Sequence, residues 1–208
     1  MNITTYPQIT FAYFDCSLDC VKNFLEIHYK HEREIKKISV IDSKYNPRDV
    51  FVEFEQLKQI RRNSGQHCSQ KAFFYNPSCD SSKTIMVSNL FDGWYTLCNI
   101  VSRKLACKCY LLEMCEYNVS EPKNCLTYID GFAITRVVYV LKEGKRWLFF
   151  EQDNPLWFEE ADHYKQRIKK KRLSREILIG YCYKLGLPIN NFDFWETDKN
   201  GIYLESLL

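Results

Sequence analysis

The sequence lacks any apolar run of the roughly 20 residues that a membrane-spanning helix needs. Its first residues, MNITTYPQITFAYFD, contain neither the basic segment nor the long apolar segment of a secretory signal. These two absences predict a cytoplasmic chain that does not associate with a membrane.

The ten cysteines include no C-x-x-C pair, which is the usual spacing of a zinc knuckle. In a cytoplasmic chain, free thiols are the expected state. His28 and His31 lie three residues apart, but H-E-x-x-H is absent and no third ligand is evident. His67 next to Cys68 is an alternative nucleophile pair, although no oxyanion-hole motif accompanies it. We therefore expect no metal and no cofactor.

Phosphate-binding loops are absent as well, because neither G-x-x-x-x-G-K-[ST] nor G-x-G-x-x-G occurs. The turn Asn89–Trp94 has a single glycine, and Asp92 would repel an anion there. No complete catalytic triad can be read from the sequence. We assign no catalytic residue, which leaves the enzyme question open and favours a role without catalysis.

What the sequence has is a globular composition over 208 residues, with 46% apolar and 15% aromatic side chains. That length suits one large domain or two small ones. The polar run 63–70 contains Ser-Gly and is the best candidate boundary. We predict one α+β domain over 1–208, in which residues 1–65 form a candidate β-α-β-β-α subdomain and residues 70–208 the main body.

The clearest local signal lies between Thr84 and Met114. Thr84–Ser88 is typical of a strand, and Asp92 can cap the helix that follows. The apolar face of that helix recurs at helical spacing: Trp94, Leu97, Cys98, Val101 and Leu105. Cys107–Met114 then returns as a strand. Earlier segments predict strands over Gln8–Phe14, Lys37–Ile41, Asp49–Phe54 and Ala72–Tyr75, and helices over 17–30 and 55–62.

A β-rich segment follows. Asp130-Gly131 predicts a hairpin between Leu126–Ile129 and Phe132–Leu141, and Arg146–Glu151 runs back. The long strand is apolar on both faces: Ile134, Val138 and Val140 lie on one, and Val137, Tyr139 and Leu141 on the other. We therefore expect both of its faces to be covered.

The last part of the chain predicts the longest helix and a final hairpin. The helix extends over Glu159–Leu185 and ends at Gly186. Phe192–Glu196 and Ile202–Leu204 flank Asn200-Gly201 as a hairpin. Together, these elements predict an α+β fold with a mainly antiparallel sheet and helices packed on it.

The net charge of +3 is unevenly distributed. Seven cations and no acid lie in the predicted basic helix 163–175, which leaves 22 basic and 26 acidic side chains elsewhere, a net of −4. Clustered cations with nearby aromatic side chains suit an acidic protein or nucleic acid, whereas a solvated helix face needs no partner. The candidate binding residues are Trp157, Tyr164, Arg167, Lys169, Lys170, Lys171, Arg172 and Arg175.

We interpret the chain as a non-catalytic protein-binding module, such as an immunity or antitoxin protein, an adaptor or an effector. It would use an aromatic-rich, locally basic surface, and a protein is the expected partner. One alternative is an enzyme acting on a phosphate-bearing or nucleic-acid substrate, with acids such as Asp92, Asp130, Glu151 or Asp153. The other is a non-catalytic nucleic-acid binder that uses the basic helix.

Overall fold

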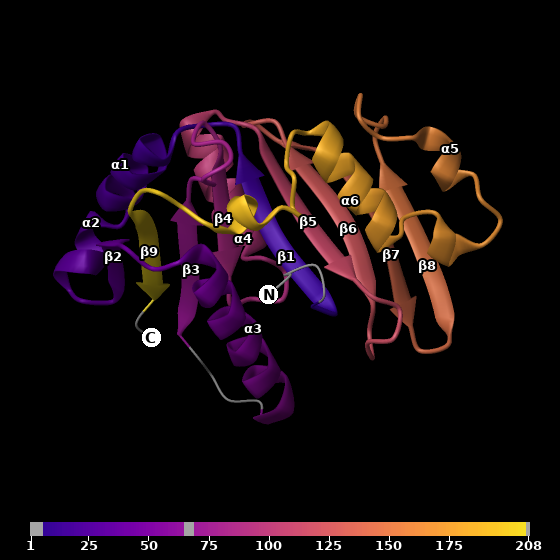
Figure 1. The fold of residues 1–208 in the computed structure, drawn as a ribbon, viewed down its shortest axis with the longest axis horizontal. Coiled ribbons are helices and arrows are strands. Elements are labelled where there is room, and N and C mark those ends of the chain that lie inside the picture. The colour runs from indigo at the N-terminus through magenta and orange to yellow at the C-terminus, as the bar shows by residue number, and fades with distance from the viewer. Residues whose placement is uncertain (1–5, 65–68, 207–208) are drawn as a thin grey trace.

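The computed structural model describes residues 6–64 and 69–206, which form a nine-stranded sheet with helices on both faces (Figure 1). Neighbouring strands are antiparallel throughout. Their spatial order is β2 (Ile38–Ser43), β9 (Gly201–Ser206), β3 (Gln70–Tyr75), β4 (Thr84–Ser88), β1 (Gln8–Phe14), β5 (Cys109–Cys115), β6 (Lys123–Ile129), β7 (Ile134–Glu143) and β8 (Arg146–Gln152). The predicted α+β class is confirmed, and β1 contributes a central strand from the N-terminal third.

The helices are mostly short. They are α1 (Leu18–His28), α2 (Lys30–Glu34), α3 (Pro47–Ser64), α4 (Tyr95–Leu105), α5 (Ala161–Tyr164) and α6 (Arg175–Lys184), with 3-10 turns η2 (Lys169–Lys171) and η3 (Phe192–Trp195). The predicted strand β4 and the apolar face of α4 are confirmed, since Leu97, Cys98 and Val101 are buried. None of the described helices combines the length and apolar character needed to cross a membrane.

The sheet separates two hydrophobic cores. Phe54 of α3, Leu178 of α6 and Trp195 of η3 pack on the face that points toward the viewer in Figure 1. Val21 of α1 and Leu97 of α4 pack on the other face. Burying each such side chain stabilises the fold by about 1.5 to 3 kcal/mol. The sequence therefore needs apolar positions on both faces of the central strands.

The second face is covered over only part of its width. Val138 and Val140 of β7 are fully buried on the first face, whereas Val137, Tyr139 and Leu141 on the second face are half-buried. The expectation that both faces of this strand are covered is therefore wrong. The side chains of β7 that point away from α6 form the floor of a hollow beside α4.

Residues 49–54 are helical, so the predicted strand Asp49–Phe54 is wrong. They belong to α3, which begins at Pro47, a residue whose fixed φ suits the first turn of a helix. The buried side chains Val50, Phe51 and Phe54 lie on one helical face. The alternation of three apolar residues is too short to distinguish a strand from a helix. Burial of Phe51, which the alternation would place on the opposite face, favours the helix.

Residues 159–185 do not form one helix, and the predicted basic helix 163–175 is wrong. Only α5 and η2 occur before α6 begins at Arg175. Ser174 has an extended backbone, and its hydroxyl accepts a hydrogen bond from the Ile177 N–H as the cap of α6. Leu173 is fully buried, so the chain turns inward just before the cap. The predicted end is confirmed, because Gly186 follows α6 with a φ of 72°.

The predicted strand Phe192–Glu196 is also wrong, because this segment forms the 3-10 turn η3. Phe194 and Trp195 are buried, and the indole N–H of Trp195 donates to the Ile189 carbonyl at 2.8 Å. The aromatic side chains therefore anchor a turn onto the sheet. Strand β9 pairs instead with β2 and β3.

Candidate functional site

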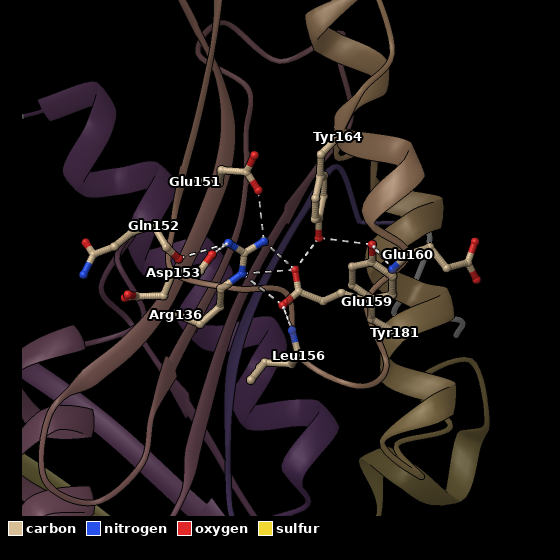
Figure 2. Close-up of polar contacts among 9 residues, drawn as sticks. All are labelled: Arg136, Glu151, Gln152, Asp153, Leu156, Glu159, Glu160, Tyr164 and Tyr181. Carbon is tan, nitrogen blue, oxygen red and sulfur yellow. Dashed lines mark hydrogen bonds and ion pairs between the residues drawn. The ribbon is translucent and has the colours of Figure 1, made fainter.

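A buried ion pair ties the segment after β8 to the sheet (Figure 2). The side chains of Arg136, on β7, and Glu159 are both fully buried. The guanidinium Nη2 of Arg136 lies 2.9 Å from Glu159 Oε2, and its Nε donates to Oε1 at 3.1 Å. Its Nη1 donates to the backbone oxygens of Gln152 and Asp153, at 3.0 and 2.6 Å. Arg136 thus joins β7 to the end of β8 and to the segment that follows.

The carboxylate of Glu159 accepts further hydrogen bonds. The Leu156 N–H donates to it at 2.8 Å, and the Tyr164 hydroxyl also donates to it. The oxygens of the Tyr164 and Tyr181 hydroxyls lie 3.1 Å apart, and that of Tyr181 accepts from the Glu160 N–H at 3.1 Å. The network therefore connects β7, the segment after β8, and α6.

Arg136 and Tyr164 each keep a single protonation state near neutral pH. Burial alone would lower the pKa of Arg136, but the hydrogen bonds and charge of Glu159 outweigh it, and the pKa is raised. Burial raises the pKa of Tyr164 far above its ordinary value, and the hydrogen bond to Glu159 adds to this effect. Neither group exchanges a proton near neutral pH, so these two side chains suit positioning rather than acid–base catalysis.

We call residues 153–172 the basic strap. It displays Trp157, which is 76% exposed, together with the exposed cations of Arg167 and Lys169–Lys171. Two other candidate binding residues are not at the surface, because Tyr164 is 4% exposed within the network and Arg175, just beyond the strap, is 5% exposed. Tyr164 and Arg175 thus contact the interior, and partner binding by the exposed residues stays a prediction.

The two remaining arginines have structural contacts. Arg175 donates to the Tyr6 carbonyl at 2.6 Å and lies 3.6 Å from the Glu116 carboxylate. Burial lowers the pKa of Arg175. The guanidinium of Arg172 lies 4.9 Å from the ring centre of Phe149, which holds the end of the strap against β8.

The lysine turn η2 is fixed to the fold by an aromatic pair. The hydroxyl of Tyr117 donates to the Lys170 carbonyl, and the Lys170 ammonium lies 6.0 Å from the same ring. Tyr117 packs edge-on against Trp147 of β8, with ring centres 5.1 Å apart. The three lysines therefore project from a turn whose backbone is held.

A second candidate site lies on the opposite face of the sheet. Asp92 and Tyr95, at the start of α4, form one wall of a hollow of about 450 Å³. Its floor consists of mainly apolar side chains of β5, β6 and β7: Leu111, Cys125, Thr127, Val137, Tyr139 and Leu141. A neighbouring hollow of about 460 Å³ shares Asp92, Glu113 and Lys123 with it. An apolar floor with a few polar groups is typical of binding pockets.

Glu113 and Lys123 form the polar end of both hollows. The Lys123 ammonium lies 2.7 Å from Glu113 Oε1, and the Glu113 side chain is only 9% exposed. Burial raises the pKa of Glu113, Lys123 opposes that rise, and Asp92 adds to it. The carboxylate of Glu113 therefore depends on Lys123 for its main compensating charge.

Lys123→Met should lower the free energy of unfolding by about 1 to 2 kcal/mol at neutral pH, because it leaves a buried carboxylate without its cation. The pKa of Glu113 in the folded protein is already raised above its usual value of 4.5 and should rise further. A raised carboxyl pKa means that the folded state binds the proton more tightly, so this group's contribution to stability is lost as pH rises through the folded pKa.

The difference in the free energy of unfolding between Lys123→Met and the parent protein should therefore become smaller as pH falls toward about 4.5, the usual pKa of a glutamate. Urea denaturation over a pH series measures it. Lys145→Met, at an exposed turn position, is the control for loss of a surface lysine. A difference in the free energy of unfolding that stays constant with pH would contradict the inference that Lys123 compensates the buried charge of Glu113.

The enzyme hypothesis assigns chemistry to four carboxylates: Asp92, Asp130, Glu151 and Asp153. Asp92 lines the hollows, whereas Asp130 accepts hydrogen bonds within its own turn, from Phe132 and Ala133 N–H. Glu151 Oε2 lies 3.4 Å from Arg136 Nη2. The structure gives these carboxylates different surroundings rather than one shared cleft.

The predicted cap of α4 by Asp92 is wrong. The Asp92 carboxylate accepts a hydrogen bond from the Trp94 N–H at 3.0 Å, which closes the turn before α4 rather than capping the helix itself.

Among the histidine and cysteine candidates that the structure describes, His28 has an aromatic neighbour. His28 stacks against Phe24, with ring centres 5.0 Å apart. In the part of the chain that the structure describes, no three His, Cys, Asp or Glu side chains are grouped to hold a metal. His67 and Cys68 lie outside the described residues.

Sequence reasoning missed four functional candidates: Arg136, Glu159, Glu113 and Lys123. One signal was present, since Arg136 is a lone charge in the apolar run 134–141. A charge on the buried face of a strand requires a partner. The partner, Glu159, is 23 residues away and could not be identified without the fold.

A scan against protein-family models finds no matching family, and searches of curated proteins and of solved structures find no similar protein or fold. No activity is therefore carried over to this chain from another protein.

Proposed function

We propose that this chain is a non-catalytic protein-binding module whose partner presents an acidic surface to the basic strap. The main support is the Arg136–Glu159 network, which fastens a strap whose Trp157 side chain is 76% exposed. Tryptophan is enriched among the residues that dominate binding energy at interfaces. A large aromatic side chain that is exposed on an anchored segment is therefore suited to contact a partner.

The charge of the strap points to an acidic partner. Three of its four acids are paired: Glu159 with Arg136, Glu160 with Lys184 at 2.6 Å, and Asp162 with Lys165 at 2.8 Å. Only the fourth, Asp153, is left to offset the cations of the strap. Among the described residues, Arg167 and Lys169–Lys171 take part in no ion pair. The positive charge of the strap is thus left facing solvent, where it can steer an acidic surface into contact.

The anchoring also favours affinity. Ordering a mobile loop on binding opposes association, and a segment that is already held avoids much of that loss. The network fixes the first half of the strap, and the contact of Tyr117 with Lys170 fixes the second half. The strap can therefore bind without first being ordered.

The test is capture of partners from native cells by the tagged protein, with and without nuclease, read by mass spectrometry. We expect a stoichiometric partner that survives nuclease. Against that purified partner, Trp157→Ala and the triple variant K169Q/K170Q/K171Q should each weaken binding at least about tenfold, a loss of about 1.4 kcal/mol or more.

The matched control is K30Q/K37Q/K44Q, which removes three exposed lysines around β2, at the other edge of the sheet. It should leave affinity within about twofold, since charges distant from an interface are largely screened. Equal weakening by both triple variants would contradict the proposal. Capture that is lost on nuclease treatment would favour nucleic acid as the ligand of the lysine turn.

A further inference from the structure

Two cysteines face each other where the pairing of strands β1 and β5 is continued by two more residue pairs. Phe14 is opposite Cys109, and the Asp15 N–H donates to the Lys108 carbonyl at 2.9 Å. Continuing the same antiparallel register places Cys16 opposite Cys107. Their side chains belong to the core that packs against α1 and α4.

This register gives the pair a geometry that a disulfide requires. Because Asp15 bonds to Lys108, the next pair along is of the non-hydrogen-bonded kind, whose Cα atoms lie about 4.5 Å apart. Disulfides span Cα distances of about 4.4 to 6.8 Å. Continued to Cys16 and Cys107, the register therefore brings the two Cα atoms into the range that a disulfide can span.

Other hydrogen bonds hold the two backbones in place. The Cys107 N–H donates to the Ser102 carbonyl at 3.0 Å, and the Ser102 hydroxyl donates to the Cys107 carbonyl at 2.5 Å. On the other side, the Thr84 hydroxyl donates to the Cys16 carbonyl at 2.7 Å. The pair is thus positioned by contacts that oxidation would leave intact.

The two thiols already interact, and the interaction is unequal. A hydrogen bond from the Cys16 thiol lowers the pKa of Cys107 and raises that of Cys16. The thiolate is the reactive form of cysteine, so Cys107 is the nucleophile of the pair. Cys107 is 6% exposed and Cys16 is half-buried, which admits a small reagent but not a large one.

We propose that Cys16 and Cys107 are a redox modification site that a small peroxide converts into a reversible disulfide. The Cys107 sulfur attacks one peroxide oxygen, the O–O bond breaks, and a sulfenic acid and one water are formed. The Cys16 sulfur then attacks the sulfur of that sulfenic acid, which releases its oxygen as a second water. Overall, two thiols are oxidised to one disulfide, and hydrogen peroxide is reduced to two waters.

A second pair of cysteines provides an internal control. Cys98 on α4 and Cys109 on β5 also share a hydrogen bond, but both are fully buried. Burial raises the pKa of Cys109 well above its usual value. Because a peroxide cannot reach a thiolate there, Cys98 and Cys109 should stay reduced under the conditions that oxidise Cys107.

The experiment treats the native full-length protein with hydrogen peroxide, blocks the remaining thiols with N-ethylmaleimide, and maps tryptic peptides by mass spectrometry. Trypsin leaves Cys16 and Cys20 together on residues 1–22, and Cys107 alone on residues 105–108. We expect these two peptides to be joined, and dithiothreitol to separate them. The disulfide should raise Tm by about several degrees, because it restricts the unfolded chain.

Two variants identify the partner of Cys107. Cys20→Ser should retain the linked peptides, and Cys16→Ser should abolish them while the protein keeps its fold, checked by its Tm. Three outcomes would each overturn the proposal. They are a disulfide between Cys16 and Cys20, alkylation of Cys107 by N-ethylmaleimide after peroxide treatment, and linked peptides that persist in Cys16→Ser.

Discussion

Glu159→Gln should lower the free energy of unfolding by about 3 to 5 kcal/mol, which is the usual effect of breaking a buried ion pair. The substitution keeps the shape of the side chain but removes its charge. It also places an amide NH₂ among groups that donate hydrogen bonds to Glu159, from Arg136, Leu156 and Tyr164. The Arg136 guanidinium is then left fully buried, and its other ion-pair partner among the described residues, Glu151, is partly exposed. Urea denaturation measures the loss.

A double-mutant cycle separates the pair from the general effect of substitution. Arg136→Met and Glu159→Leu together should be less destabilising than the sum of the two single variants, by about 1.5 to 3 kcal/mol, because neither buried charge remains. Asp162→Asn is the control within the same strap, since the Asp162–Lys165 pair is almost fully exposed. It should leave stability unchanged. A Glu159→Gln variant as stable as Asp162→Asn would contradict the anchoring role of the network.

The same variants distinguish anchoring from recognition. Glu159→Gln should weaken partner binding by loosening the strap, and should lower stability at the same time. The triple lysine variant K169Q/K170Q/K171Q should weaken binding without lowering stability, because η2 projects these side chains into solvent. The two effects can therefore be assigned to different residues of one strap.

Local patterns were sufficient for much of the fold. The sequence predicted β1, β4 and α4 because each has a period or a capping residue that acts over a few residues. The hairpin of β6 and β7 follows from Asp130-Gly131, where Gly131 has a φ of 93°. These elements depend on interactions between residues that are close in the sequence, so they can be recognised from the sequence alone.

The sequence-based predictions were wrong where tertiary contacts determine the secondary structure. Residues 159–185 consist largely of good helix formers, yet burial of Leu173 and the cap at Ser174 divide the segment. At 49–54, alternation and helical spacing fit the same short run, and packing of Phe51 against Trp195 selects the helix. Propensity is a weak guide wherever a long-range contact stabilises the alternative.

The residue pairs of the candidate site could not be predicted from the sequence, for a related reason. Its important pairs join residues on different elements, such as Cys16 with Cys107, or Arg136 with Glu159. Charge clustering drew attention to residues 163–175, but burial removes Tyr164 and Arg175 from the surface of that segment. Only the fold shows which aromatic and basic side chains face solvent.

Gly131→Ala should lower the free energy of unfolding by about 3 kcal/mol, since it combines backbone strain with a steric clash. A Cβ at this position would lie 2.7 Å from the carbonyl carbon of Ala106. That atom belongs to the backbone that ends α4, where Ala106 itself has a φ of 48° and the next N–H, of Cys107, bonds to Ser102. The neighbour therefore has little freedom to move aside.

Gly144→Ala is the matched control for this substitution. Gly144 has a φ of 57° in the hairpin between β7 and β8, but a Cβ there would meet no atom within 4 Å. Only the left-handed backbone then opposes alanine, which should lower stability by about 1 kcal/mol. Equal losses in urea denaturation would mean that the close approach to Ala106 has no effect. A larger loss at Gly131 would show that the backbone at the end of α4 does not move aside for the added Cβ.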